Sequence, residues 1–170
     1  AMALAGEPSL IIADEPTTAL DVTIQAQVLT LLRRTAHERG ASLLLITHDL
    51  GVVAETAQQI AVMYAGHIVE EGPAAEVLRS PSNPYTRDLV NSIPTFARRG
   101  TSLATIAGNV PSPAAFPSGC RFHTRCRYAI ADCAAAVPPL ERLGDLRAVR
   151  CIRHAELAPT LPQPMKEPVR

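Results

Sequence analysis

The sequence predicts an α/β fold followed by a small, loop-rich extension that holds four cysteines. In the first 50 residues, two short apolar runs flank one longer helical pattern, which is typical of parallel strands joined by a helix. Thirteen of the 15 prolines fall from Pro73 onward and all four cysteines from Cys120 onward. The last part of the chain is therefore expected to be irregular and to need a cross-link, such as a bound metal, for its stability.

Composition limits the possible partners. The chain has 170 residues, 47% of them apolar, and a formal net charge of zero with no basic run, so nucleic acid is not expected as a partner. No export signal opens the sequence and no apolar run is long enough to span a membrane. We therefore expect any membrane role to come through partner subunits, and the four cysteines to bind metal instead of forming disulfides.

The first predicted strand covers residues 10–13 and runs into two adjacent acids, Asp14 and Glu15. Pro16 and the threonines after it cannot continue a strand, so both acids lie at its carboxyl end, where open α/β sheets bind ligands. At such an edge, Asp14 can hold Mg²⁺ through water and Glu15 can act as general base toward an attacking water. The alternative is a strand end with two solvated acids.

A β-α-β unit is predicted from these residues onward. Asp21 can cap a helix over residues 22–38, and a second strand over residues 42–47 ends at His48. Because parallel strands end at the same edge of a sheet, His48 is expected beside Glu15, where it can donate to a γ-phosphate oxygen. The alternative for His48 is a structural role at the start of the next helix.

Further along, the sequence predicts a β-hairpin between short helices. Ala65-Gly66 is a turn signal between two apolar runs, and Met63 and Tyr64 are expected in the core. The predicted elements are a helix over residues 49–58, strands over 60–64 and 67–71, a helix that starts at Pro73, a helix over 85–92, an extended linker over 96–118 and a Pro-rich tail over 158–170.

Two strings in the first part resemble motifs of ABC-transporter ATPases. DEPTTALD resembles the Walker B and D-loop segment, with Asp14 as the Walker B aspartate and Glu15 as the catalytic glutamate. Thr18 to Asp21 resembles the D-loop, with Thr18 in place of serine, and ITHDL resembles the H-loop with its switch histidine, His48. The resemblance implies an ABC-type P-loop nucleotide-binding domain that uses ATP and Mg²⁺.

The NPYT string at residues 83–86 narrows the resemblance to ATPases of oligopeptide and dipeptide importers, which carry HPYT, with Asn83 in place of the histidine. This family implies an ATPase that drives peptide import at the cytoplasmic side of the membrane. It also implies a second ABC ATPase subunit, two membrane-spanning permease subunits and, indirectly, an extracytoplasmic peptide-binding protein. An ABC ATPase without a membrane partner is a weaker alternative, because NPYT and the cysteine extension argue against it.

Two motifs of such ATPases are absent from the sequence. The only lysine is Lys166, preceded by Met165, so no G-x-x-x-x-G-K-[ST] phosphate loop exists, and no two glycines are adjacent, so no LSGGQ-type signature exists. We therefore expect a C-terminal part of a longer subunit that starts after the signature motif. Because ATP affinity depends on the phosphate loop, this chain alone is expected to hydrolyse ATP negligibly.

Cys120, Cys126, Cys133 and Cys151 form the pattern C-x5-C-x6-C-x17-C among basic neighbours. Zinc sites usually hold two cysteines two to four residues apart, and no pair here is that close. The wider spacing favours a 4Fe-4S cluster, with Zn²⁺ as the alternative and free or disulfide-linked thiols as a third possibility. The segment around these cysteines also resembles the C-terminal extension of oligopeptide-importer ATPases, some of which carry such a cluster.

The predicted organisation has three parts: an ATPase part over residues 1–95, a four-cysteine extension over 96–157 and the tail over 158–170. A competing function, from a different class, is a metal-binding regulatory or interaction module in which the ATPase remnant serves only as scaffold.

Overall fold

The computed structural model describes residues 6–93 and 105–157. The helix end predicted at the start of the chain, the linker before residue 105 and the tail from residue 158 lie outside the described residues. The chain divides after Asp49 into two compact units, and each contains helix and strand. None of the helices in the described ranges is long and apolar enough to cross a membrane.

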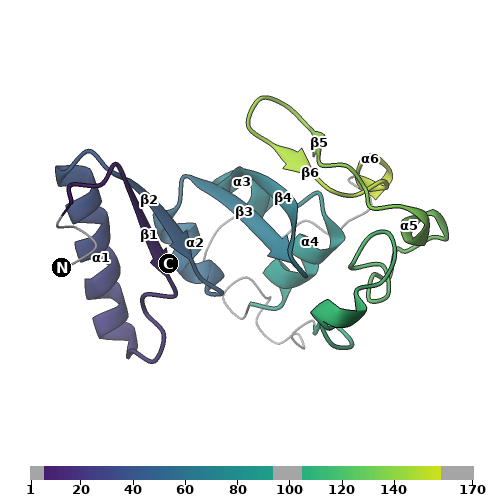
Figure 1. Cartoon of the computed structure of the whole chain (residues 1–170), viewed down its shortest axis with the longest axis horizontal. Helices are drawn as coiled ribbons and strands as arrows, with labels where there is room; N and C mark the ends of the chain where they lie inside the picture. The colour runs from purple at the N-terminus through teal and green to yellow at the C-terminus, as the bar shows by residue number, and fades with distance from the viewer. Residues whose placement is uncertain (1–5, 94–104, 158–170) are drawn as a thin grey trace. The chain divides into compact units, whose positions relative to one another are not determined.

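The first unit is the predicted parallel β-α-β unit, with its helix alongside the two strands (Figure 1). The helix begins after Asp21, whose Oδ1 accepts a hydrogen bond from the Ile24 amide at 2.9 Å, as an N-cap residue does. Gly40, with a φ of +62°, ends it. The elements are β1 (Leu10–Asp14), α1 (Val22–Glu38) and β2 (Ser42–Ile46).

One face of this two-stranded sheet is exposed, although the sequence predicted buried strands. Ile11 and Ala13 are buried on the face opposite the exposed one. Parallel strands are buried on both faces only where helices cover both, and α1 is the only helix in the described part of this unit. The outward-facing side chains and their exposed fractions are Leu10 48%, Ile12 60%, Leu44 49% and Ile46 46%.

The second unit is built on a four-stranded antiparallel sheet in the order β3-β4-β6-β5. The predicted hairpin supplies β3 and β4, and β6 from the cysteine extension pairs with β4, with Glu70 opposite Val149. The elements are α2 (Leu50–Thr56), β3 (Gln59–Tyr64), β4 (His67–Pro73), α3 (Ala74–Arg79), α4 (Pro84–Asn91), the 3₁₀-helix η2 (Pro113–Ala115), α5 (Asp132–Ala135), β5 (Glu141–Arg142), β6 (Ala148–Val149) and α6 (His154–Leu157).

Strands from both sides of the predicted domain boundary at residues 95–96 therefore share one sheet. The second folded unit begins at Leu50 and not at residue 96. The division into an ATPase part and an extension therefore stays a prediction about function.

Three aromatic rings form the centre of the second unit's core. The ring centroids of Tyr64 and Tyr85 lie 4.6 Å apart, and Phe122 lies 5.2 and 5.3 Å from them, distances that favour aromatic pairing. Tyr64 is buried as predicted, but Met63 is 60% exposed, so its prediction as a core residue was wrong. Successive side chains of a strand point to opposite faces, and these two neighbours could not share one core.

Candidate functional site

The carboxyl end of β1 holds Glu15 in an uncommon backbone conformation. Its amide continues the parallel ladder by donating to the Ile46 carbonyl at 2.8 Å, while its φ is +44°. Left-handed conformations are uncommon for residues other than glycine and gather at functional sites. The chain turns sharply here, and the Thr18 amide donates back to the Glu15 carbonyl at 3.1 Å.

Both carboxylate oxygens of Glu15 have side-chain partners in the first unit. His48 Nδ1 lies 2.9 Å from Glu15 Oε1, and Thr18 Oγ1 donates to Oε2 at 2.7 Å. The structure thus brings Glu15 and His48 together, as the parallel pairing of their strands predicts. Their catalytic roles stay predictions.

The contact changes the protonation of both groups. Hydrogen bonds from His48 and then Thr18 lower the pKa of Glu15 below 4.5, and the bond to Glu15 raises the pKa of His48 above 6.5. The raised pKa of His48 stabilises the folded state below pH 6.5, and this contribution is lost as the pH rises through that raised pKa. The lowered pKa of Glu15 stabilises the folded state above pH 4.5, and this contribution is lost as the pH falls through that lowered pKa. At mildly acidic pH both side chains are therefore charged. Protonated His48 contacts Glu15 through Nδ1, so its Nε2–H does not point to Glu15.

The other acids near this edge have different surroundings. Asp14 is the last residue of β1 and is exposed, so it is accessible to a hydrated cation. The Asp21 carboxylate accepts the cap bond of α1, which ties the predicted D-loop to the helix start. Asp49 Oδ2 accepts from Gln25 Nε2 at 3.2 Å, a link between α1 and the residue after His48. A shallow depression on α1 contains none of the predicted site residues.

The second unit gathers the four cysteines around one cavity of ≈ 20 Å³. All four thiols are free. No group of three or more His, Cys, Asp or Glu side chains in residues 6–93 and 105–157 is placed so that it could hold a metal ion. The metal assignment therefore stays a prediction. The side chains around the cavity are Asn83, Pro84, Cys120, Phe122, His123, Cys126, Tyr128, Cys133, Arg150, Cys151, Arg153 and Leu157.

Three of the cysteines belong to one tightly turned loop. The Cys120 amide donates to the Cys133 carbonyl at 2.8 Å, and the Cys126 amide donates to the His123 carbonyl at 3.3 Å. Gly119 makes this closure possible, because its φ is +67° and a Cβ there would lie 2.4 Å from the Cys133 carbonyl oxygen. The loop attaches to the core through the buried Phe122 ring.

Cys151 reaches the cavity from a different part of the chain, two residues after the end of β6. The Arg150 amide donates to the Val69 carbonyl at 2.8 Å, and the Arg150 guanidinium donates to the carbonyls of Ile68 and Pro138 at 2.8 and 2.7 Å. Arg153 Nη1 donates to the Tyr128 carbonyl at 2.5 Å. Cys151 is therefore placed mainly by the bonds of Arg150 to β4 and to Pro138, and Arg153 joins the chain after it to Tyr128 in the loop that carries the other three cysteines.

The cavity combines buried thiols with positive charge. Burial raises the pKa of Cys126 and of Cys151 to about 11, and it also raises the pKa of Cys120. Arg150 and Arg153 lie beside the cavity, where their positive charges can compensate the negative charge of thiolates. Thiols and guanidinium groups are the residue types that a metal-thiolate cluster needs, but as they lie in this structure the cavity of ≈ 20 Å³ has no room for one.

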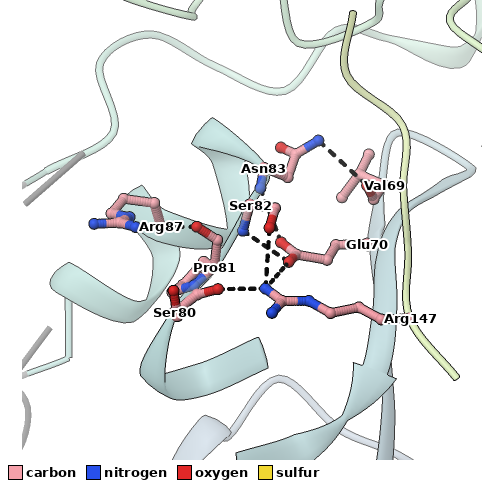
Figure 2. Close-up of polar contacts among 8 residues, drawn as sticks. All are labelled: Val69, Glu70, Ser80, Pro81, Ser82, Asn83, Arg87 and Arg147. Carbon is pink, nitrogen blue, oxygen red and sulfur yellow. Dashed lines mark hydrogen bonds and ion pairs between the residues drawn. The ribbon is translucent and has the colours of Figure 1, made fainter. Parts of the chain in front are cut away.

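A buried polar network that sequence reasoning missed joins β4 to the extension (Figure 2). Glu70 is fully buried and accepts from Arg147 Nη2 at 3.0 Å and from the amides of Ser82 and Asn83 at 2.8 and 3.0 Å. Arg147 Nη2 also donates to Ser82 Oγ at 3.0 Å and to the Ser80 carbonyl. The only sequence signal was an acid in the apolar pattern of a predicted strand.

Comparisons with known proteins add a family relationship. Residues 69–133 match the family model described as oligopeptide/dipeptide transporter, C-terminal region. A Brucella ovis protein named as a peptide import ATP-binding protein is 54% identical over 164 residues, or 93% of this chain and 48% of the relative. Dipeptide transport ATP-binding proteins of Haemophilus influenzae and Escherichia coli are 50% and 48% identical over 151 residues, or 89% of this chain and 46% of each relative. The chain spans about half the length of the curated relatives it matches.

Proposed function

Because this chain belongs to the oligopeptide/dipeptide transporter family of ATP-binding subunits, we propose that it is the part of such a subunit that carries the catalytic base for ATP hydrolysis. The observation that supports this most directly is the contact of Glu15 with His48 at the ends of two parallel strands. A carboxylate next to a histidine at this edge is suited to activate water beside a terminal phosphate.

Each residue of the edge has a proposed role in hydrolysis. Glu15 takes the proton of the attacking water, and Thr18 and His48 hold its two oxygens in place. The raised pKa of His48 favours the form that can donate Nε2–H to a γ-phosphate oxygen. Asp14 holds Mg²⁺ through water, where the ion neutralises phosphate charge. Asp21 fixes the turn between this edge and α1.

We propose the assembly that the resemblance to oligopeptide and dipeptide importers implies. A complete subunit would act at the cytoplasmic side of the membrane with a second ATP-binding subunit and two membrane-spanning permease subunits, and an extracytoplasmic protein would deliver the peptide. The relatives are named for ATP binding and for peptide or dipeptide transport, which favours this assembly over the regulatory metal-binding module as the main function.

The proposed ATPase role can be tested with a chimera. The half of the Brucella ovis relative that aligns with this chain is replaced by the chain itself, and ATP hydrolysis is measured by phosphate release. The chimera is expected to hydrolyse ATP, whereas the 170-residue chain alone is expected to stay at background because it lacks a phosphate loop. A folded chimera that binds ATP and releases no phosphate would contradict the proposal.

For the cysteine cavity we propose a 4Fe-4S cluster, with Zn²⁺ as the alternative. The support is the convergence of the four cysteines on one cavity with two arginines beside it. Such a cluster would supply a thiolate-bound anionic centre that ties the loop of residues 120–133 to Cys151.

Chain purified without oxygen is expected to be brown, with broad absorption near about 400 nm and about four irons per chain. Replacing any one of the four cysteines by serine should bleach it, because each thiolate is a ligand, while Ser112→Ala, outside the cavity lining, should leave iron content unchanged. Metal analysis and absorption spectra provide the readout. A colourless chain with one bound zinc would exclude the 4Fe-4S cluster and support the zinc site. A metal-free chain would exclude both metal sites.

A further inference from the structure

The start of α4 contacts both parts of the cysteine cavity. Asn83 and Pro84 lie in its lining, and the Asn83 side chain accepts the N-cap bond of α4 from the Tyr85 amide at 2.9 Å. Residues 83–85 are called the NPY segment below. Its two ends face different partners, because Asn83 contacts the chain before Cys151 and Tyr85 contacts the loop that holds the other three cysteines.

Asn83 holds the Cys151 side through its amide nitrogen. Nδ2 donates to the Arg150 carbonyl at 3.1 Å, and that carbonyl belongs to the peptide bond that joins Arg150 to Cys151. The same Nδ2 donates to the Val69 carbonyl at 3.2 Å, so it ties Cys151 to β4 (Figure 2 shows the Val69 bond). Asn83 is only 4% exposed, and no water can easily replace these bonds.

Tyr85 contacts the loop with the other three cysteines through the aromatic ring of Phe122. Its ring lies 5.3 Å from the Phe122 ring at 62°, and Phe122, which is 3% exposed, stands between Cys120 and Cys126 in the sequence. Cys120 and Cys126 themselves pack against the same core cluster. A shift of Tyr85 therefore moves the three-cysteine loop, whereas a shift of Asn83 moves Cys151.

We propose that the NPY segment sets the separation between Cys151 and the other three cysteines, with Asn83 and Tyr85 as positioning residues for the metal site. The cavity must widen when a cluster enters it, and this segment determines how far. The inference rests on the proposed metal function for its purpose, but the positions of the four thiols can be tested without any metal.

The test is site-resolved thiol labelling of the reduced, metal-free 170-residue chain with N-ethylmaleimide, followed by peptide mass spectrometry. Asn83→Asp keeps the cap acceptor and loses both N–H donors, so Cys151 should react about tenfold faster while Cys120 and Cys133 stay within about twofold of wild type. Tyr85→Leu should give the opposite pattern, with Cys120 and Cys126 faster and Cys151 unchanged. Asn91→Asp, the same chemical change at the other end of α4, is the matched control and should change none.

Two outcomes would overturn the positioning role: unchanged Cys151 labelling in Asn83→Asp, or equal acceleration of all four thiols. Should the aspartate unfold the chain by circular dichroism, Asn83→Ser, which still accepts the cap bond, takes its place with the same expected pattern. Iron and zinc uptake separates the two proposals. A wild-type chain that takes up neither metal contradicts the metal function, while the labelling patterns still decide the role of the NPY segment.

Discussion

Glu15→Gln is expected to lower ATP hydrolysis by the chimera by about a hundredfold to ten-thousandfold, the usual contribution of a general base. The amide keeps the shape of the side chain but cannot accept the proton of the attacking water. ATP binding should be unchanged, because Glu15 faces water and not phosphate in the proposed mechanism. Phosphate release and equilibrium nucleotide binding, measured on the same preparations, separate these two effects.

The same substitution has a second readout in the 170-residue chain. Loss of the Glu15 carboxylate should bring the pKa of His48 back down toward 6.5, because its bond to Glu15 is the main cause of the upward shift. NMR titration of the histidine ring measures this. Glu38→Gln, which alters an exposed pair on α1, is the control for both readouts. Near-normal turnover in the Glu15→Gln chimera would remove Glu15 from the mechanism.

Glu70→Ala is expected to cost the second unit about 3–5 kcal/mol of its free energy of unfolding, the usual cost of breaking a buried ion pair by removing one partner. The change leaves Arg147 without its buried carboxylate and leaves the amides of Ser82 and Asn83 without their acceptor. Since domains are stable by only about 5–15 kcal/mol, much of the unit's stability should be lost.

Urea unfolding followed by circular dichroism measures the Glu70→Ala loss, and hydrogen exchange at Ala148 and Val149 shows whether β6 separates from β4. Glu55→Ala on α2, an exposed acid, is the control and should change stability by less than about 0.5 kcal/mol. A Glu70→Ala chain as stable as wild type would contradict this prediction. It would show that β6 stays attached to the second unit through its pairing with β4 and through core packing, without the Glu70 network.

Local sequence signals were sufficient for the first unit. Asp21 before a helical pattern fixed the start of α1, and a strand on either side of that helix placed Glu15 and His48 at one edge. These features depend on neighbouring residues and on the handedness of parallel connections. The exposed face of β1 and β2 was not predictable in this way, because an apolar run does not say what covers it.

The second unit depends on contacts between distant residues, which no local pattern predicts. β5 and β6 have two residues each, too short for a periodic signal, and the sequence predicted only linker and loop there. Glu70 and Arg147 are 77 residues apart, so neither could identify the other. The NPY motif pointed to a family, but its contact with Arg150 could be seen only in the folded chain.

Gly119 restricts how the cysteine cavity can be redesigned or moved to another protein. Any side chain at this position costs about 1–2 kcal/mol for the left-handed backbone and meets main-chain atoms of Cys133 and Ala134 at 2.4 to 2.9 Å. Main chain cannot rotate aside as a side chain can. A graft that copies the four cysteines without Gly119 therefore breaks the loop it is meant to transplant. The turn has to be moved as residues 119–134 together, and the segment with Cys151 has to be added to it.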